Sequence, residues 1–581
     1  MPQKANTTSG ADLLLEILRN YAVEYLFSSP GTEWAPLWEA LAKQRGKGIG
    51  GPVYLGSRHE DIATGMALGY AKATSKLAVC AVHSTVGTLH ASMGIRAAYQ
   101  QRTPMLVLSG ESLTLGEGGH AWVGGQWERF LTDYGGPARL VEPFVKSTFC
   151  VNSDVLLPGV IHRACRMAMN APAGPVFLSV PYEFLAAPAI SSAPAATEMP
   201  VTALADPAAL RQAATILATS KRPMIITENL GRNPRAVSDL VDLAEMLGAP
   251  VVESMHPEQV NFPRRHDLHG GFSPQPFLEK SDAVLLLDMI GSPWYPDTAG
   301  RPAKATIITI GEDPLRERMP YNAIAPDLVI SGRADNALQQ LISMLKAKLR
   351  GQKKAIAGRS ARIARINKSR RAKWHKEART TAKNSPIDMR WFCQELNAVL
   401  PSNAVLVDET IISRTSLLNT FDGMKPGHFI DALSGGLGLG LGAGLGVKVA
   451  NPDKPVITIV GDGTFNYNPP LAALGFCQEY DMPMLIIIAN NNRYRSMQMA
   501  VDNSYPNGWA KRTDTYFGAQ ISPSVNYAGM AALVDGYGET VEDVAEIRPA
   551  IARAFQALKA GKPVILDIII DDEMKFLTSV H

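Results

Sequence analysis

The stretch Gly461–Asn492 constrains the fold of this chain more than any other. A buried-strand signal leads directly into Gly461-Asp462-Gly463, and a helical stretch and a second apolar run follow, ending in the asparagines 490–492. Strand, helix and strand predict a βαβ unit with parallel strands. Such a unit brings Asp462 and Asn491 together at the strand ends, where open α/β sheets bind their ligands.

The residue types at these two strand ends indicate what the ligand would be. Glycines on both sides of Asp462 let the backbone come close to a phosphate. One carboxylate, the Asn491 amide oxygen and a few main-chain carbonyls make a hard oxygen site, of the kind Mg²⁺ takes when it also holds a diphosphate. The alternative is a tight turn and a polar loop in an ordinary α/β domain.

Length and composition set the outer limits. With 581 residues, 46% of them hydrophobic, the chain is too long for one core and fits about three domains. No apolar run approaches the ~20 residues that span a membrane, and the N-terminus lacks the apolar core of a signal peptide. Five scattered cysteines without CxxC spacing fit a reducing cytoplasm. We therefore expect a cytoplasmic protein that does not engage a membrane.

Strand and helix signals alternate along most of the chain, which predicts α/β domains with open parallel sheets. We assign a first domain to residues 1–190, a middle domain to 201–345 and a third domain to 386–581, with an Ala/Pro/Ser-rich linker between the first two. The middle domain shows few reactive side chains, and we interpret it as mainly structural.

A basic stretch separates the middle and third domains at 346–385. Between Lys346 and Lys383 there are fifteen Lys or Arg and one Glu, a balance of +14, so the rest of the chain sums to −11. The composition predicts a solvated connecting helix. Because no aromatic interleaving or recognition motif accompanies the charge, we do not expect a nucleic-acid partner; an acidic partner or a phosphorylated substrate stays open.

Three segments together carry a family resemblance. The Gly461-Asp462-Gly463 motif with its asparagine cluster is similar to the thiamine diphosphate signature, and His59-Glu60 with the small-residue stretch 63–71 resembles a second segment of the same family. Residues 10–570 resemble the 2-oxo-acid decarboxylase and acetohydroxyacid synthase family, and the segments 82–88 and 174–182 look most like benzoylformate decarboxylase. The resemblance implies pyrimidine-binding, middle and diphosphate-binding domains, with thiamine diphosphate and Mg²⁺ as cofactors.

The resemblance assigns cofactor contacts residue by residue. It implies that Asp462, Asn491 and the carbonyl of Arg493 bind the metal. It places further cofactor contacts at Gly461, Gly463, Thr464, Thr410, Gly435, Gly436 and Leu437. Glycine permits close approach to the aminopyrimidine, and Leu437 is the expected apolar wedge that bends the cofactor.

Catalytic roles follow from the same resemblance. Glu60 would promote the tautomer of the pyrimidine that deprotonates the thiazolium carbon, a role that suits a carboxyl group in an apolar setting. His83, at the end of a buried strand, would donate or accept a proton beside the reacting carbon. Thr32 would touch the substrate carboxylate. The alternatives are an exposed Glu at a helix start, a histidine bonded to backbone, and a simple turn.

Departures from the family pattern fall on the substrate side. Arg493 and Arg495 stand where the family has glycine, and two isoleucines at 411–412 replace hydroxyl residues expected near the diphosphate. The benzoylformate decarboxylase pattern has a second histidine from the middle domain, and residues 291–295 contain none. His120 or Gln126, in an apparent insertion, would be substitutes.

The resemblance implies non-oxidative decarboxylation of a 2-oxo acid to an aldehyde, with carboligation as a possible side activity. An acetolactate-synthase-like carboligase and a 2-hydroxyacyl-CoA lyase stay open as enzyme alternatives, and a scaffold that only binds thiamine diphosphate stays open as a non-enzyme. The family builds its sites between subunits, so we expect a dimer or tetramer whose shared sites join Glu60 of one chain to Asp462 of another.

Overall fold

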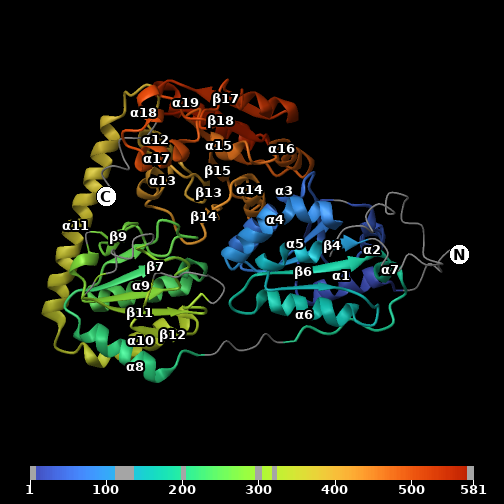
Figure 1. The fold of residues 1–581 in the computed structure, drawn as a ribbon, viewed down its shortest axis with the longest axis horizontal. Helices are drawn as coiled ribbons and strands as arrows, with labels where there is room; N and C mark the ends of the chain where they lie inside the picture. Colours follow the sequence, from blue (N-terminus) through green and yellow to red (C-terminus); the bar gives the residue numbers. More distant parts are fainter. Residues whose placement is uncertain are drawn as a thin grey trace.

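The computed structural model describes residues 8–29, 31–111, 136–197, 204–275, 277–294, 302, 304–316 and 324–571. Three parallel sheets of six strands each, flanked by helices, form the chain (Figure 1). The expected α/β architecture with three open parallel sheets is confirmed. Within the described residues, none of the helices combines the length and the apolar character that a membrane crossing requires.

The first sheet has the strand order β2-β1-β3-β4-β6-β5. Its strands are β1 (Tyr25–Ser28), β2 (Val53–Gly56), β3 (Ala78–His83), β4 (Met105–Glu111), β5 (Ser147–Cys150) and β6 (Pro175–Pro181). Its helices are α1 (Gly10–Asn20), α2 (Ala35–Gly46), α3 (Glu60–Thr74), α4 (Ser84–Gln100), α5 (Gly136–Val141), α6 (Leu157–Met169) and α7 (Tyr182–Ala186). Side chains of α1, α2 and α6 form the core on one face of the sheet, and those of α3 and α4 the core on the other.

The middle sheet has the order β12-β11-β10-β7-β8-β9. Its strands are β7 (Pro223–Thr227), β8 (Val251–Glu253), β9 (His269–Gly271), β10 (Ala283–Leu287), β11 (Thr306–Gly311) and β12 (Leu328–Ser331). The helices α8 (Pro207–Thr219), α9 (Pro234–Leu247) and α10 (Ala334–Lys348) pack on it through a core of its own.

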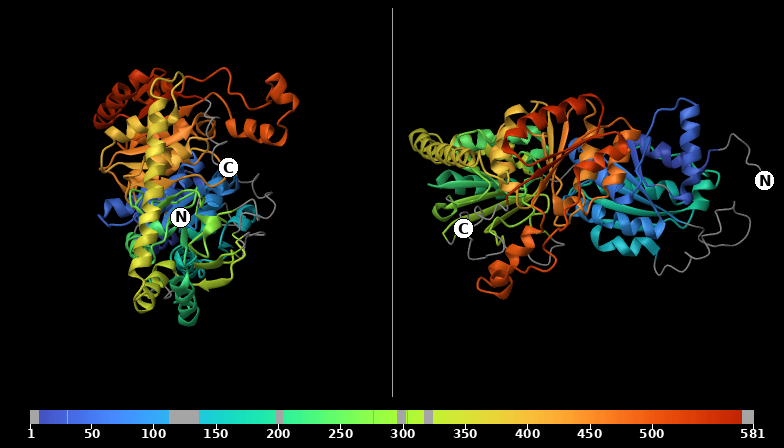
Figure 2. Two further views of the ribbon diagram at one scale, coloured as in Figure 1. Left: turned by 90° about the vertical axis from the view of Figure 1, so that its left-hand side faces the viewer. Right: turned by 90° about the horizontal axis from the view of Figure 1, so that it is seen from above.

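The third sheet has the order β14-β13-β15-β16-β18-β17. Its strands are β13 (Val405–Glu409), β14 (Phe429–Asp431), β15 (Val456–Gly461), β16 (Leu485–Asn490), β17 (Tyr537–Val541) and β18 (Val564–Ile569). Its helices are α12 (Met389–Val399), α13 (Arg414–Thr420), α14 (Gly440–Ala450), α15 (Asp462–Phe465), α16 (Pro470–Glu479), α17 (Arg495–Ser504), α18 (Trp509–Thr513) and α19 (Ile547–Lys559). The segment with α17 and α18 stands out from the third domain in the side view of Figure 2.

The first and third domains share one continuous core. Buried residues of α3 and α14 belong to a single apolar cluster that reaches both sheets. Because glycines lie on both helices at the crossing, their backbones come unusually close. The two domains that the resemblance assigns to the cofactor are therefore packed against each other through one apolar core within one chain.

The basic stretch forms the long helix α11 (Lys353–Thr380), which runs along the middle and third domains (Figure 1). Arg359 donates to the carbonyl of Leu247, and Arg370 donates to the carbonyl of His269 at 3.0 Å. At its other end, the Trp374 indole donates to Thr420 of the third domain at 3.2 Å. Several of its cations thus cap backbone carbonyls while the helix joins two domains.

Candidate active site

Asp462 and the asparagine cluster meet where two central strands of the third sheet end. β15 and β16 are hydrogen-bonded neighbours with Gly461 opposite Ala489, so Asp462 and Asn490 both lie at the carboxyl edge. The Asp462 carboxylate accepts hydrogen bonds from the backbone amides of Asn492 and Arg493. The parallel pairing predicted from the sequence is present, and it brings Asp462 into contact with the loop that follows β16.

The Asp462 carboxylate has the surroundings of a cation ligand. The residue is 3% exposed, and its Oδ2 is buried without a hydrogen-bond partner. Burial raises the pKa of Asp462 to about 6. A divalent cation at Oδ2 would supply the missing partner and favour the charged form. The donor set at this edge therefore fits Mg²⁺.

The three asparagines at 490–492 differ in their contacts. The buried Asn490 donates to Asp567 at 3.0 Å and accepts from the Asn492 amide at 3.0 Å, so it fastens the loop to the sheet. The Asn491 side chain is half-buried, and its Oδ1 accepts from the Arg493 amide at 3.2 Å. Asn492 has φ +56°, a left-handed turn that asparagine tolerates. The turn lies between Asn491 and Arg493, which the resemblance pairs with Asp462 as metal ligands.

The Tyr494 ring leaves no room for a side chain at Gly463. A Cβ at this position would lie 2.6 Å from ring carbons of Tyr494, so the aromatic ring closes directly over the glycine. Thr464 is 5% exposed, and its carbonyl accepts from the Asn468 side chain at 3.0 Å. These two residues and Gly461 form the compact turn into α15 that the phosphate-binding prediction needs.

A buried carboxylate shapes the glycine loop at 435–440. Glu409 Oε1 accepts from the amides of Gly438 and Leu439 at 2.8 Å each, and its Oε2 accepts from the Gly440 amide at 2.7 Å and from the Asn468 side chain at 3.2 Å. The Glu409 carboxylate thus accepts from amides at the start of α14 that would otherwise lack partners. Burial raises the pKa of Glu409 to about 7.

The loop held by Glu409 presents the residues predicted to touch the aminopyrimidine. Gly435 is exposed with φ +73°, and Leu437 is half-buried, so an apolar side chain remains accessible at the centre of the loop. A Cβ on Gly436 would lie 2.3 Å from the Met93 sulfur, and Arg96 donates to the Ser434 carbonyl at 3.0 Å. Helix α4 of the first domain therefore supports this loop in the same chain.

The Thr410 side chain, which the resemblance predicts to contact the cofactor, is bonded inside the protein. It is 1% exposed, and its hydroxyl donates to Asp408 at 2.7 Å. Asp408 is itself paired with Arg414 at 3.2 Å. The hydroxyl proton of Thr410 is thus committed inside the protein, and a donor for a diphosphate at this loop would come from a neighbouring group. Ile411, which follows, is 44% exposed.

Glu60 opens helix α3 and is 9% exposed, so it is not the exposed helix-start residue of the alternative interpretation. Its Oε2 lies 3.3 Å from Nδ1 of His90, and the His90 ring stacks on His59 with centroids 5.0 Å apart. His59 caps the helix by accepting from the Asp61 amide at 3.2 Å. The carboxylate therefore sits between a capped helix end and α4, close to Gly87.

His83 ends strand β3, as predicted, and it is paired with a carboxylate. Its Nδ1 lies 2.8 Å from Oε2 of Glu33, whose side chain is fully buried. The hydrogen bond with Glu33 raises the pKa of His83. Thr32 precedes Glu33 in the short turn Thr32–Trp34 and is exposed. The turn carrying Thr32 thus lies against the strand end that carries His83.

Two side chains of this site were not singled out from the sequence. Glu33 directly follows Thr32 in the sequence, and Glu409 directly precedes Thr410. The proximity of Glu33 to Thr32 was the only available signal, since nothing in the spacing connects it to His83. His120, Gln126 and Tyr295 lie outside the described residues, and Trp294 is 5% exposed.

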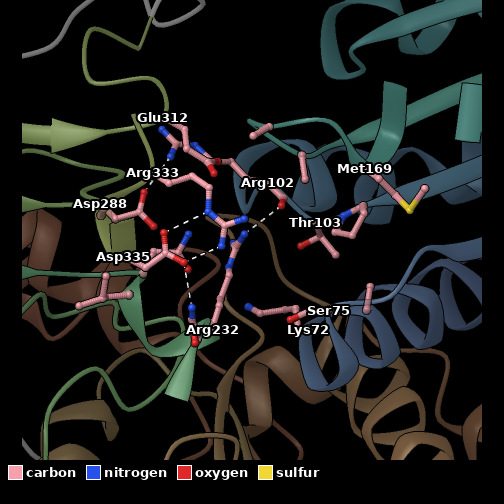
Figure 3. Close-up of a pocket in the computed structure, with 18 of the residues that line it drawn as sticks. Lys72, Ser75, Arg102, Thr103, Met169, Arg232, Asp288, Glu312, Arg333 and Asp335 are labelled. Atoms are coloured by element: carbon pink, nitrogen blue, oxygen red, sulfur yellow. Dashed lines mark hydrogen bonds and ion pairs between the residues drawn. The ribbon is translucent and has the colours of Figure 1, made fainter. Parts of the chain in front are cut away.

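A separate pocket of about 540 Å³ lies between the first and middle domains, at the carboxyl ends of the middle strands (Figure 3). Arg102 pairs with Asp288 at 3.2 Å, and Arg333 pairs with Asp335 at 2.6 Å. Arg232 donates to the carbonyl of Arg102 at 3.0 Å. The contacts of Arg102 with Asp288 and of Arg232 with the Arg102 carbonyl join the two domains, whereas the Arg333–Asp335 pair lies within the middle domain. The predicted cofactor residues do not line the pocket.

Known families and structures match this arrangement along nearly the whole chain. The chain matches the thiamine pyrophosphate enzyme N-terminal TPP binding domain at residues 8–127, the central domain at 210–341 and the C-terminal TPP binding domain at 414–568. It is similar to the solved benzoylformate decarboxylase of Polynucleobacter necessarius, with a TM-score of 0.78 and 20% identity over 97% of this chain and 99% of that one.

Curated relatives span decarboxylases and synthases. The chain is 26% identical to an acetolactate synthase large subunit of Buchnera aphidicola (97% of this chain, 95% of the relative) and 24% identical to the benzoylformate decarboxylase of Pseudomonas aeruginosa (95% and 97%). It is 29% identical to a probable 2-ketoarginine decarboxylase of Pseudomonas aeruginosa (84% and 83%). The resemblance noted in the sequence is confirmed, and the chain belongs to the thiamine pyrophosphate enzymes.

Proposed function

We propose that this protein is a thiamine diphosphate- and Mg²⁺-dependent enzyme that decarboxylates a 2-oxo acid to an aldehyde. The observation that carries the choice of decarboxylation is His83, which stands at a strand end with Nδ1 held 2.8 Å from the buried Glu33. A histidine oriented in this way is equipped to move a proton at a reacting carbon. Relatives of both kinds have similar identities, so the comparisons do not choose between decarboxylase and synthase.

The metal-binding half of the proposal rests on Asp462, Asn491 and the carbonyl of Arg493, which would hold Mg²⁺. The partnerless buried oxygen of Asp462 supports this assignment. Gly461, Gly463 and Thr464 would surround the diphosphate, whereas the amide and the hydroxyl of Thr410 both donate to Asp408. Gly435, Gly436 and Leu437 would support the aminopyrimidine. When bound, thiamine diphosphate supplies a carbon nucleophile for the substrate carbonyl and an electron sink for the electron pair that the departing CO₂ leaves behind.

The chain's own residues would bind the substrate and move protons. Glu60, largely buried at the start of α3, would hold a proton against the pyrimidine ring nitrogen. Thr32, exposed beside the His83 strand end, would donate its hydroxyl to the substrate carboxylate. Nε2 of His83 would deliver a proton to the carbon that CO₂ has left, and the aldehyde would depart once its hydroxyl proton is removed and the bond that attaches the carbon breaks. Loss of the carboxylate leaves that carbon in need of one proton, so the step balances.

We also propose that the working enzyme is a homo-oligomer whose sites are completed between chains. Apolar side chains are exposed near both halves of the site. Val86 and Leu89 on α4 are 40% and 53% exposed, and Tyr467 and Leu471 near α15 and α16 are 56% and 54% exposed. Contact with another chain would bury them and remove water from Glu60 and Asp462.

The test is an assay of purified protein with thiamine diphosphate and Mg²⁺ that measures CO₂ and identifies the organic product. Pyruvate, branched-chain 2-oxo acids, 2-ketoarginine and benzoylformate are the first substrates. Aldehyde equal in amount to CO₂ supports the proposal. Acetolactate or another hydroxyketone as main product would replace decarboxylation by carboligation, and cleavage of a 2-hydroxyacyl-CoA would replace it by acyl-CoA lyase activity. Binding of the cofactor without turnover of any of these compounds would favour a scaffold.

A further inference from the structure

The carboxylate of Glu33 is fully buried beside the His83 ring. Glu33 is 0% exposed, whereas its partner His83 keeps about a fifth of its side chain accessible. Burial raises the pKa of Glu33, because removing its carboxylate from water costs free energy. A buried acid is stabilised by a paired cation, and the hydrogen bond to the His83 ring supplies that pairing.

The backbone around Glu33 leaves room for this one side chain. A Cβ on Gly110, at the end of β4, would lie 2.1 Å from Cγ of Glu33. A Cβ on Gly31 would lie 2.3 Å from Nδ1 of His83 and 2.4 Å from the Glu33 carboxylate. Glycines on both sides therefore form the slot in which the carboxylate meets the imidazole.

Neighbouring contacts fix both partners. The indole of Trp34, 1% exposed, donates to the carbonyl of Val82 at 3.0 Å and ties the Glu33 turn to the end of β3. Ser84, directly after His83, has φ +27°, a backbone conformation that is strained for serine. The strand end is thus held in a geometry that directs His83 toward Glu33.

We propose that Glu33 is a positioning residue for His83: its carboxylate holds Nδ1–H, which makes Nε2 the nitrogen that exchanges protons with the substrate. This inference rests on the proposed function for its catalytic consequence and on the geometry for the pairing. It goes beyond the family resemblance, which assigned a role to His83 and none to Glu33.

Three carboxylates influence the His83 ring. Glu33 makes the hydrogen bond and the largest contribution to the raised pKa of His83, which burial opposes, while Glu60 and Glu111 act through space. Glu111, half-buried at the end of β4, accepts from Ser109 at 3.1 Å. It is therefore a matched control, because it is a nearby acid with the same charge that does not hold the ring.

The experiment compares the unmodified enzyme with Glu33→Gln, Glu33→Ala and Glu111→Gln. The first variant keeps an acceptor and removes the charge; the second removes both. The ring is titrated directly by NMR of histidine labelled with ¹³C at Cε1, and His83→Gln identifies the His83 signal among the eleven histidines. In parallel, kcat and kcat/KM are measured against pH with the best 2-oxo acid. Unfolding midpoints establish that each variant is folded.

We expect Glu33→Gln to lower the His83 titration midpoint by about 1 pH unit or more, as loss of an adjacent opposite charge should. The alkaline limb of kcat should move by the same amount. Glu33→Ala should lower kcat about 10- to 100-fold with little change in KM, and Glu111→Gln should change each quantity much less.

Two results would overturn the inference. An unchanged His83 titration in folded Glu33→Gln would remove the pairing, and a shifted titration with an unchanged pH profile would remove its role in the reaction. If no 2-oxo acid is turned over by the unmodified enzyme, the proposed function fails. The NMR titration then decides alone whether Glu33 holds His83 protonated.

Discussion

Gly65 and Gly442 meet backbone to backbone where α3 crosses α14. A Cβ on either residue would lie 2.9 Å from the Cα of the other. Glu60 begins α3, and the loop with Leu437 leads into α14. The helix that carries the predicted proton-holding acid and the helix that follows the predicted cofactor loop are thus in direct backbone contact.

Widening this crossing should destabilise the protein. In Gly69→Ala the new Cβ would lie 2.0 Å from the Ala443 carbonyl oxygen, so the helices must separate. We expect a loss of about 1–3 kcal/mol in the free energy of unfolding and weaker cofactor binding. Gly358→Ala is the control, because Gly358 lies within α11 with nothing within 4 Å of the new atom; it should gain about 0.5–1 kcal/mol. Urea denaturation measures the free energy of unfolding of both variants. Equal changes in Gly69→Ala and Gly358→Ala would contradict close packing of α3 on α14.

A buried ion pair joins the first and middle domains. Lys72 Nζ lies 2.7 Å from Glu258, and the two side chains are 2% and 5% exposed. Replacing Lys72 by Met leaves Arg232, 3.7 Å away, as the cation paired with the buried Glu258 carboxylate, so the cost should lie near the lower end of the range of about 3–5 kcal/mol for a broken buried pair. Adding Glu258→Gln should recover part of that loss, and a double-mutant cycle by urea denaturation measures the coupling.

Lys76→Met is the control for this pair, since Lys76 bonds Glu24 at the surface with side chains 50% and 46% exposed. A surface pair of this kind should change the free energy of unfolding by less than about 1 kcal/mol. Additive losses in the cycle at Lys72 and Glu258 would show that the two residues do not stabilise each other.

Stability should depend on pH through Asp61, beside Glu60 in α3. Burial raises its pKa from 3.8 to about 7, and its Oδ1 is buried without a hydrogen-bond partner. Because the folded pKa is raised, the stability that Asp61 contributes is present below pH 3.8 and is lost as the pH rises toward 7. Asp61→Asn removes this loss and should stabilise the isolated protein at pH 8 by about 1–3 kcal/mol, the helix N-terminus offsetting part of the effect.

At pH 5 the same substitution should have a much smaller effect than at pH 8, since most of the Asp61 side chain is then protonated in the folded state. Thermal unfolding at both pH values checks the difference. A stabilisation of equal size at pH 5 and pH 8 would show that the gain does not come from the charge.

Glu60 should be needed for turnover and dispensable for binding. Glu60→Gln keeps the size of the side chain and removes its ability to share a proton, so we expect kcat to fall by about 10²-fold or more. The affinity for thiamine diphosphate with Mg²⁺, measured by calorimetry, should change by only a few fold. The neighbouring His90→Gln, which keeps α4 intact, should lose far less activity. Normal turnover by Glu60→Gln would remove this residue from the mechanism.

Local sequence patterns predicted those parts of the site that depend on strand ends. The run into Gly461-Asp462-Gly463 and the later asparagines were enough to predict neighbouring strands, and the structure pairs Gly461 with Ala489. His83 follows the same logic, because an apolar run ending in a polar residue marks a strand end at the sheet edge. These inferences need only periodicity and the right order of elements.

Long-range contacts could not be predicted in the same way. No local pattern shows that Gly65 will touch Gly442, or that Glu33 will turn inward onto His83. Thr410 illustrates the converse, since the sequence displays its hydroxyl but not that Asp408 accepts it. Side-chain direction after a turn depends on what the rest of the chain packs there, and a single sequence does not contain that information in readable form.

The most direct test of the account is the cofactor dependence of CO₂ release in the unmodified protein and in Asp462→Asn. After removal of cofactors by chelation and dialysis, we expect no CO₂ from any 2-oxo acid. Thiamine diphosphate with Mg²⁺ should restore release together with an equal amount of aldehyde, and Asp462→Asn should need far more Mg²⁺ because its amide lacks the charge that binds the ion. CO₂ release that is independent of the cofactors, or an Mg²⁺ requirement unchanged by Asp462→Asn, would contradict the proposed site.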